Sequence, residues 1–247
     1  MNSRAQQTVN SRHVHIVFIG NSITFGAGLR NPAHESPPFR AAFYLSAQPS
    51  VAAVDYANRG VCGATTVDFL PDRHTLWKDV VRSADRFKDE SWATLLFSIS
   101  LGTNDSAVQG PTGCPVSSQQ YRRNMTAIID RLLTLYPACR VVVHRPLWYS
   151  PNTSNGAVYL EEGLARLQTY FPQLQQMVTE YGRRFPHRVF LGDTEGYERL
   201  KADYTVYYQP EKGNEGVFYL HPNAAGAALL GECWGKALMQ ALAGNEE

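Results

Sequence analysis

The sequence predicts an α/β protein with three layers, α/β/α, built on a central and mainly parallel sheet of five strands. Two observations carry this prediction. Short apolar runs rich in β-branched residues alternate along the chain with longer stretches in which apolar residues recur at helical spacing. No internal repeat, low-complexity segment or linker interrupts this alternation, so we expect a single domain over residues 13–247 after a flexible tail at residues 1–12.

The expected strands are short apolar runs bounded by turn-forming residues. The first ends at Gly20-Asn21, and the run at residues 92–101 is the most apolar, which places it in the centre of the sheet. Strands that alternate with helices favour parallel pairing through right-handed crossovers. The five expected strands cover residues 14–19, 51–57, 92–101, 139–144 and 189–191.

The expected helices show apolar residues three and four positions apart. The first ends before Pro49, a fourth continues past the internal Pro172, and Asn223 is a suitable N-cap for the last. A helical stretch after the second strand is interrupted near Pro71. The expected helices cover residues 38–48, parts of 66–87, 117–135, 161–183 and 223–243.

Composition excludes several classes of partner. The 247 residues have a net charge of +1, which offers no electrostatic attraction for nucleic acid or an anionic membrane surface. The polar N-terminus lacks the apolar core of a secretory signal, and no run of about 18 apolar residues occurs. We therefore expect a cytoplasmic protein that binds a small molecule, with secretion after signal removal as the alternative; the oligomeric state is left open.

The cysteines argue against a metal centre. They are far apart in the sequence and form no CxxC pair, so we expect no metal site. We expect four reduced thiols, with disulfides as the alternative that an even count permits. The four residues are Cys62, Cys114, Cys139 and Cys233.

Ser22 is the first candidate for chemistry. It comes just after the carboxyl end of the first strand, where open α/β sheets bind their ligands. The alternative is that Ser22 caps the next helix.

Three later stretches bear on that choice. They are Asn58-Arg59-Gly60-Val61-Cys62-Gly63-Ala64-Thr65, Leu101-Gly102-Thr103-Asn104-Asp105 and Leu220-His221-Pro222-Asn223. Together with Gly20-Asn21-Ser22-Ile23-Thr24, and in this order, they resemble the SGNH/GDSL hydrolases, a family of serine esterases. The resemblance runs from about Val14 to the C-terminus and implies the family's flavodoxin-like fold. It also implies that Ser22 is the nucleophile and His221 the general base, with Ser22, Gly63 and Asn104 as oxyanion-hole donors.

Each of these residue types suits its implied role. A glycine leaves its backbone N–H accessible to a developing oxyanion, and an asparagine amide donates a second hydrogen bond. Histidine accepts a serine proton near neutral pH. Taken alone, Gly63 would be interpreted as a loop glycine and Asn104 as a turn residue. We assign Asp105 to holding its loop, and Cys62 to packing rather than to chemistry.

The chain departs from the family at one position. Most members have an aspartate three residues before the histidine, where this chain has Phe218. That third group fixes the histidine tautomer and stabilises the imidazolium. We therefore expect a Ser22–His221 dyad whose imidazole donates to a backbone carbonyl near Phe218, with Glu215 and Asp193 as the alternative partners.

The expected activity is hydrolysis of a short-chain ester through an acyl-serine intermediate. This covalent serine chemistry requires no cofactor. Several aromatic residues fall near the expected crevice, and such rings suit a sugar better than an alkyl chain. The predicted substrate is therefore an O-acetylated carbohydrate such as an acetylated xylo-oligosaccharide. The alternatives are a lysophospholipid or acyl thioester, or a catalytically inactive carbohydrate-binding relative. The aromatic residues are Trp148, Tyr149, Tyr204, Tyr207, Tyr208 and Tyr219.

Overall fold

A computed structural model describes residues 12–244 except 74, 88 and 91. Five parallel strands form the central sheet in the order β2-β1-β3-β4-β5, which confirms the predicted fold class. The strands are β1 (Arg12–Gly20), β2 (Val51–Gly60), β3 (Ala93–Ser100), β4 (Arg140–Val143) and β5 (Val189–Leu191). A separate antiparallel pair, β6 (Glu211–Gly213) and β7 (Gly216–Phe218), forms a hairpin at the edge of the molecule.

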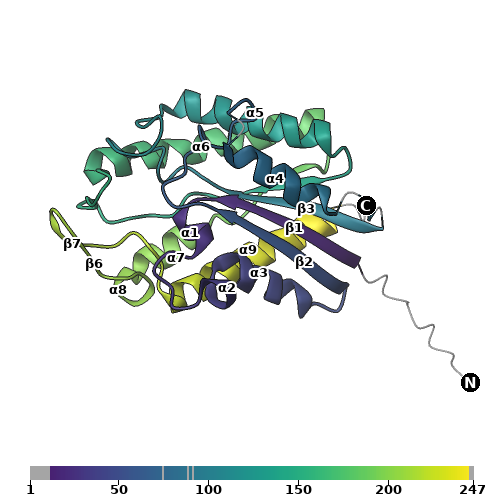
Figure 1. The fold of residues 1–247 in the computed structure, drawn as a ribbon, viewed down its shortest axis with the longest axis horizontal. Helices are drawn as coiled ribbons and strands as arrows, with labels where there is room; N and C mark the ends of the chain where they lie inside the picture. The colour runs from purple at the N-terminus through teal and green to yellow at the C-terminus, as the bar shows by residue number, and fades with distance from the viewer. Residues whose placement is uncertain (1–11, 74, 88, 91, 245–247) are drawn as a thin grey trace, which may run out of the picture.

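Helices cover both faces of the sheet (Figure 1). Helices α4, α5 and α6 lie on one face, and α3 and α9 lie on the other. The long helices are α3 (Pro37–Ser46), α4 (Thr75–Asp85), α5 (Ser118–Leu135), α6 (Leu160–Arg184) and α9 (Ala224–Ala243). The short helices are α1 (Ser22–Phe25), α2 (Pro32–Glu35), α7 (Gly196–Ala202) and α8 (Tyr204–Tyr207). In the part of the chain that the structure describes, no helix combines the length and apolar character needed to span a bilayer.

All five expected strands and the long helices are present, with shifts at their ends. Arg12, the last residue of the expected tail, belongs to β1 and pairs with Val51. Residues 1–11 of that tail lie outside the described residues. Residues 66–73 form turns rather than helix. The Thr65 N–H donates to the Asp68 carboxylate and the Thr66 N–H donates to that of Asp105, and such side-chain bonds compete with helix formation.

The core follows from the apolar strands. Val14 and Ile16–Ile19 of β1 are fully buried, as expected for a central parallel strand covered on both faces. On the α9 side, Trp234 stacks on Phe18 with ring centroids 6.2 Å apart. The sheet is therefore fixed between its two helical layers.

Three neighbouring strands end level with one another. In the ladder Gly20, the last residue of β1, pairs with Gly60 of β2 on one side and with Ser100 of β3 on the other. The chain turns from β1 to β2 on one side and later returns to β3 on the other, which makes this edge a topological switch point. The loops that follow these strands therefore lie side by side.

Gly60 allows α1 to approach the end of β2. A Cβ at this position would lie 2.2 Å from the backbone nitrogen of Phe25 in α1, which is far inside contact distance. By contrast, a Cβ on Gly182 of α6 would meet nothing within 4 Å. We expect Gly60→Ala to destabilise the protein by about 2 kcal/mol or more, because backbone must move to relieve the overlap.

Gly182→Ala is the matched control, and we expect it to raise stability by about 0.5–1 kcal/mol through better helix propensity. Urea unfolding followed by circular dichroism measures both changes. Equal stability of the two variants would contradict the close packing of α1 on β2.

Candidate active site

Ser22 stands at a sharp turn between β1 and α1. Asn21 caps the helix, since its side-chain oxygen accepts from the Ile23 N–H at 3.0 Å. Ser22 is therefore the first residue of α1 and not its cap, which rules out the alternative that its side chain serves only to cap this helix. The half-buried side chain is left available for another partner.

That partner is His221. Its Nε2 lies 2.9 Å from Ser22 Oγ, although 199 residues separate the two in the chain. His221 comes just before α9, whose cap Asn223 accepts from the N–H groups of Ala225 and Gly226 at 3.0 Å. The Gln209 N–H donates to the His221 carbonyl at 2.9 Å, which fixes the other side of the loop.

A carboxylate completes the arrangement, and the expected dyad is wrong. Both oxygens of Glu211 lie near His221 Nδ1, at 2.9 and 3.1 Å, and one of them also accepts the His221 backbone N–H at 3.1 Å. With Nδ1–H donating to Glu211, the lone pair on Nε2 faces Ser22 and can accept its proton. The geometry is that of a serine–histidine–acid triad.

The hairpin explains how glutamate replaces the missing aspartate. Phe218, which occupies the family's aspartate position, is 1% exposed and pairs directly with Glu211 across the antiparallel strands. Residues directly opposite in such a pair share one face of the sheet. The acid has therefore moved to the neighbouring strand. A short run around Gly213-Asn214-Glu215-Gly216 was the sequence signal for this hairpin.

Neither of the two predicted alternatives reaches the imidazole. Asp193 is buried elsewhere, where its Oδ1 accepts the N–H groups of Glu195 and Gly196 at the start of α7. At the tip of the hairpin, the main-chain carbonyl of Glu215 accepts a hydrogen bond from Asn152 Nδ2 at 3.1 Å. Neither alternative is therefore the partner of His221, because sequence distance alone does not reveal which carboxylate faces the imidazole.

Two backbone N–H groups at or near Ser22 are available as hydrogen-bond donors. Among the described residues, neither the Ser22 N–H nor the Gly63 N–H has a hydrogen-bond acceptor. Gly63 has φ +78°, a conformation that favours glycine, and its exposed position leaves the N–H accessible. The neighbouring Cys62 is exposed, which corrects the expectation that it packs in the interior.

Asn104 lies in the loop after β3 and is 3% exposed. Its Nδ2 donates to the Ala64 carbonyl at 2.9 Å, and its Oδ1 accepts from the Tyr159 hydroxyl at 2.6 Å. An amide carries two hydrogens, so the second remains for an oxyanion. Asp105 holds the loop as predicted, by accepting from Thr66, and its burial raises its pKa to about 6.

A second serine–histidine pair lies in the interior. Ser98 Oγ is 2.9 Å from His144 Nε2, and His144 Nδ1 accepts the Asp193 N–H at 3.0 Å. Because Nδ1 accepts, the neutral imidazole carries its hydrogen on Nε2 and cannot deprotonate Ser98. Burial lowers the pKa of His144 to about 3, and the ring stacks on Trp234. This pair is part of the core.

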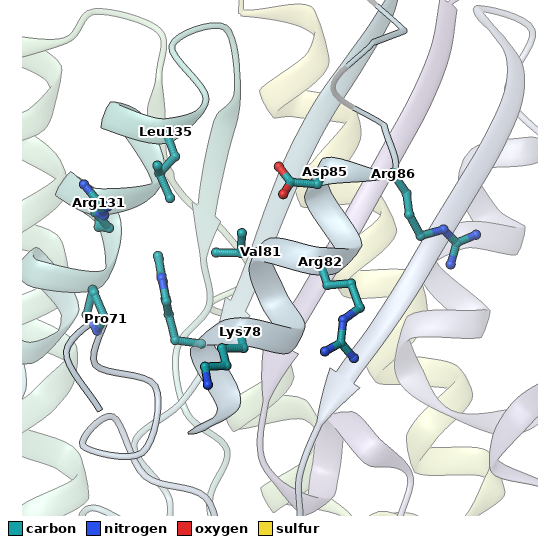
Figure 2. A pocket seen from close by; sticks show the side chains of 9 residues that line it. Pro71, Lys78, Val81, Arg82, Asp85, Arg86, Arg131 and Leu135 are labelled. Atoms are coloured by element: carbon teal, nitrogen blue, oxygen red, sulfur yellow. The ribbon is translucent and has the colours of Figure 1, made fainter. Parts of the chain in front are cut away.

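A cavity of about 650 Å³ lies away from the triad, between α4 and α5 (Figure 2). Its described lining combines apolar side chains such as Trp77 and Leu135 with cationic ones such as Lys78 and Arg131. Among the described lining residues there is no serine or histidine, so they include no pair like that of Ser22 and His221.

The six predicted aromatic residues divide into buried and accessible ones, with Tyr207 half-buried. Trp148, Tyr149 and Tyr208 are at most 7% exposed and belong to the core, so they do not line an open crevice as predicted. Tyr204 is 38% exposed, and its ring meets that of Tyr219 edge to face with centroids 4.8 Å apart. Tyr219 lies two residues before His221, which leaves this pair as the aromatic surface nearest the triad in sequence.

The family assignment agrees with this geometry. Residues 18–229 match the model of the GDSL-like lipase/acylhydrolase family, so the chain belongs to that family and is a hydrolase. The match begins within β1 and ends within α9, so it spans all the elements that carry the triad. No curated protein matched the sequence.

Solved structures of esterases share the fold. A carbohydrate acetylesterase from Sinorhizobium meliloti superposes with a TM-score of 0.61 at 17% identity, over 93% of this chain and 99% of that one. A variant of an acetyl-xylooligosaccharide esterase from Geobacillus gives 0.62 at 16% identity, over 94% and 95%. An aryl esterase from M. smegmatis gives 0.60 at 17% identity, over 92% and 98%. At these identities the likeness establishes the fold.

The contact between Glu211 and His221 yields a prediction. We expect Glu211→Gln to lower kcat by about 10³–10⁴, because an amide cannot stabilise the imidazolium and favours the wrong histidine tautomer. Steady-state kinetics with a chromogenic acetyl ester measures the effect.

Glu215→Gln is the matched control in the same hairpin, and we expect wild-type kinetics because only the main chain of Glu215 makes a contact there. Undiminished turnover in Glu211→Gln would restore the dyad hypothesis.

Proposed function

We propose that this protein is a serine esterase that removes acetyl groups from carbohydrates such as acetylated xylo-oligosaccharides. The observation that carries the esterase assignment is the hydrogen-bonded chain from Ser22 through His221 to Glu211, beside the open N–H groups of Ser22 and Gly63. This arrangement suits acyl transfer to a serine and needs no metal ion.

The reaction would proceed in two steps. Ser22 Oγ attacks the ester carbonyl while His221 Nε2 takes its proton, and the resulting oxyanion accepts from Ser22, Gly63 and Asn104. The imidazolium, stabilised by Glu211, then protonates the departing alcohol. Water then attacks the acyl-serine while His221 takes one of its protons, and the imidazolium returns this proton to Ser22 Oγ as acetate leaves.

The choice of an acetylated sugar rests on two supports. Two of the structurally similar proteins bear names that describe esterases of acetylated carbohydrates. The paired rings of Tyr204 and Tyr219 offer an apolar face with hydrogen-bonding edges, which suits a sugar ring. A lipid or thioester substrate is the competing proposal, supported by exposed apolar side chains such as Phe25 at 46% and Val217 at 50%.

The nucleophile is tested by covalent labelling. We expect a fluorophosphonate probe to modify a single residue, Ser22, because the adjacent imidazole activates this hydroxyl. Mass spectrometry of the digested protein locates the label, and Ser22→Ala removes both label and esterase activity while leaving the melting temperature nearly unchanged.

Ser98→Ala is the matched control, since Ser98 contacts the buried His144, and we expect labelling of Ser22 to persist in it. A label on another serine, or a Ser22→Ala protein with wild-type turnover, would contradict the assignment of Ser22 as the nucleophile.

The acyl group and the alcohol are tested together. We expect kcat/KM for acetyl, butyryl and octanoyl esters of one chromogenic alcohol to fall by about tenfold or more from acetyl to octanoyl. Acetate release from acetylated xylo-oligosaccharides, followed by a coupled acetate assay, should then proceed with wild-type protein and stop with Ser22→Ala. A preference for octanoyl, or no acetate from the sugars, would favour the lipid or thioester substrate.

A further inference from the structure

The oxyanion donor Asn104 has two fixed neighbours that determine its orientation. An asparagine amide can present either its oxygen or its nitrogen in a given direction, and only the nitrogen donates. Ala64 offers a carbonyl, which can only accept, so Nδ2 must face it. Oδ1 then faces Tyr159, whose hydroxyl lies 2.6 Å away.

We propose that Tyr159 is a positioning residue of the oxyanion hole, whose hydroxyl locks the Asn104 amide so that its free Nδ2 hydrogen serves the oxyanion. This inference rests on the proposed ester hydrolysis at Ser22. A single bond to Ala64 would allow the amide plane to rotate about it. A second bond at Oδ1 holds both ends of the amide, and a preorganised donor costs no reorganisation during the reaction.

The Tyr159 hydroxyl is itself held in place. Tyr159 is 3% exposed, and its ring packs edge to face on Tyr149 with centroids 5.2 Å apart. Its N–H and that of Leu160 both donate to the Thr153 carbonyl, at 3.1 and 3.2 Å. Burial raises the pKa of Tyr159 far above its usual value, so the hydroxyl keeps its proton and can donate to Asn104.

The backbone next to Tyr159 adds to this placement. Leu160, the first residue of α6, has φ +55°, a left-handed conformation that a branched side chain rarely adopts. Such strain persists where the surrounding structure over-determines the local conformation, and it concentrates at functional sites. Here the strained residue joins α6 to the tyrosine that contacts the oxyanion donor.

Kinetics of Tyr159→Phe test the proposal. This variant removes one oxygen atom, and we expect kcat for a chromogenic acetyl ester to fall about tenfold, more than a surface change would cause and less than the 10²–10³ expected for loss of the donor in Asn104→Ala. The KM should change less than about twofold, because the oxyanion forms only in the transition state.

Tyr149→Phe is the matched control. It removes the same atom from the adjacent buried tyrosine, whose hydroxyl bonds to Ser106 at 2.8 Å, and we expect its kcat to stay within about twofold of wild type. If Tyr159 acts through Asn104, then Tyr159→Phe should have no further effect in an Asn104→Ala background. An unchanged kcat in Tyr159→Phe, or the same tenfold loss in both backgrounds, would overturn the proposal.

A further measurement uses the wild-type protein, so it does not depend on the stability of a tyrosine variant. The side-chain NH₂ signals of Asn104 are assigned by comparing two nitrogen-15 NMR spectra: they are present in the wild-type protein and missing from Asn104→Ala. We expect them to be well separated and slow to exchange with water, because both ends of the amide are held. Averaged or rapidly exchanging signals would contradict the lock. Absence of esterase activity in the wild-type protein would instead count against the proposed function.

Discussion

The level ends of β1, β2 and β3 are the constraint on which the site depends. Because Gly20 pairs with Gly60 on one side and Ser100 on the other, the loops that carry Ser22, Gly63 and Asn104 leave the sheet at one height. The proposed nucleophile Ser22 follows the middle strand, and a proposed oxyanion donor follows the strand on each side. A one-residue slip in either pairing would turn every side chain of the slipped strand to the opposite face and bury polar groups in the core.

The histidine reaches this edge by a different route. His221 belongs to a loop before α9, and α9 packs against α3 on one face of the sheet. Gln209 joins the two regions, since its side-chain amide donates to the carbonyls of Ala27 and Pro222 at 3.2 and 3.0 Å. The distance between Ser22 and His221 therefore follows from helix packing and a few polar contacts rather than from the sheet alone.

Burial separates the groups that we propose to react from those that hold them in place. Ser22 and His221 are partly exposed, whereas Asn104, Asp105 and Tyr159 are buried with hydrogen-bond partners. Buried polar groups with satisfied partners are rigid, because breaking any one bond leaves an unpaired group in a medium of low dielectric constant. The loop after β3 thus combines the order of the core with a position at the open edge of the sheet.

The sequence predicted the features with strong local signals. The buried strands and long helices were predictable because their apolar residues recur with the period of each element. Ser22 and His221, which the family resemblance singled out, lie within hydrogen-bond distance of each other. The triad acid was missed because β6 and β7 have three residues each, too few to show alternation. Glu211 faces His221 because it pairs with Phe218, and the sequence signal for this register is confined to the short turn between the two strands.

That pairing has a consequence for how such enzymes diverge. An acid that acts from a hairpin is placed by strand pairing rather than by a three-residue spacing, so Glu211 lies ten residues before His221. What must be conserved instead is the two-residue turn at Asn214-Glu215, which sets the alignment of the strands. Relatives that lack the aspartate motif can therefore retain a full triad, and a search for them should follow the hairpin rather than the motif.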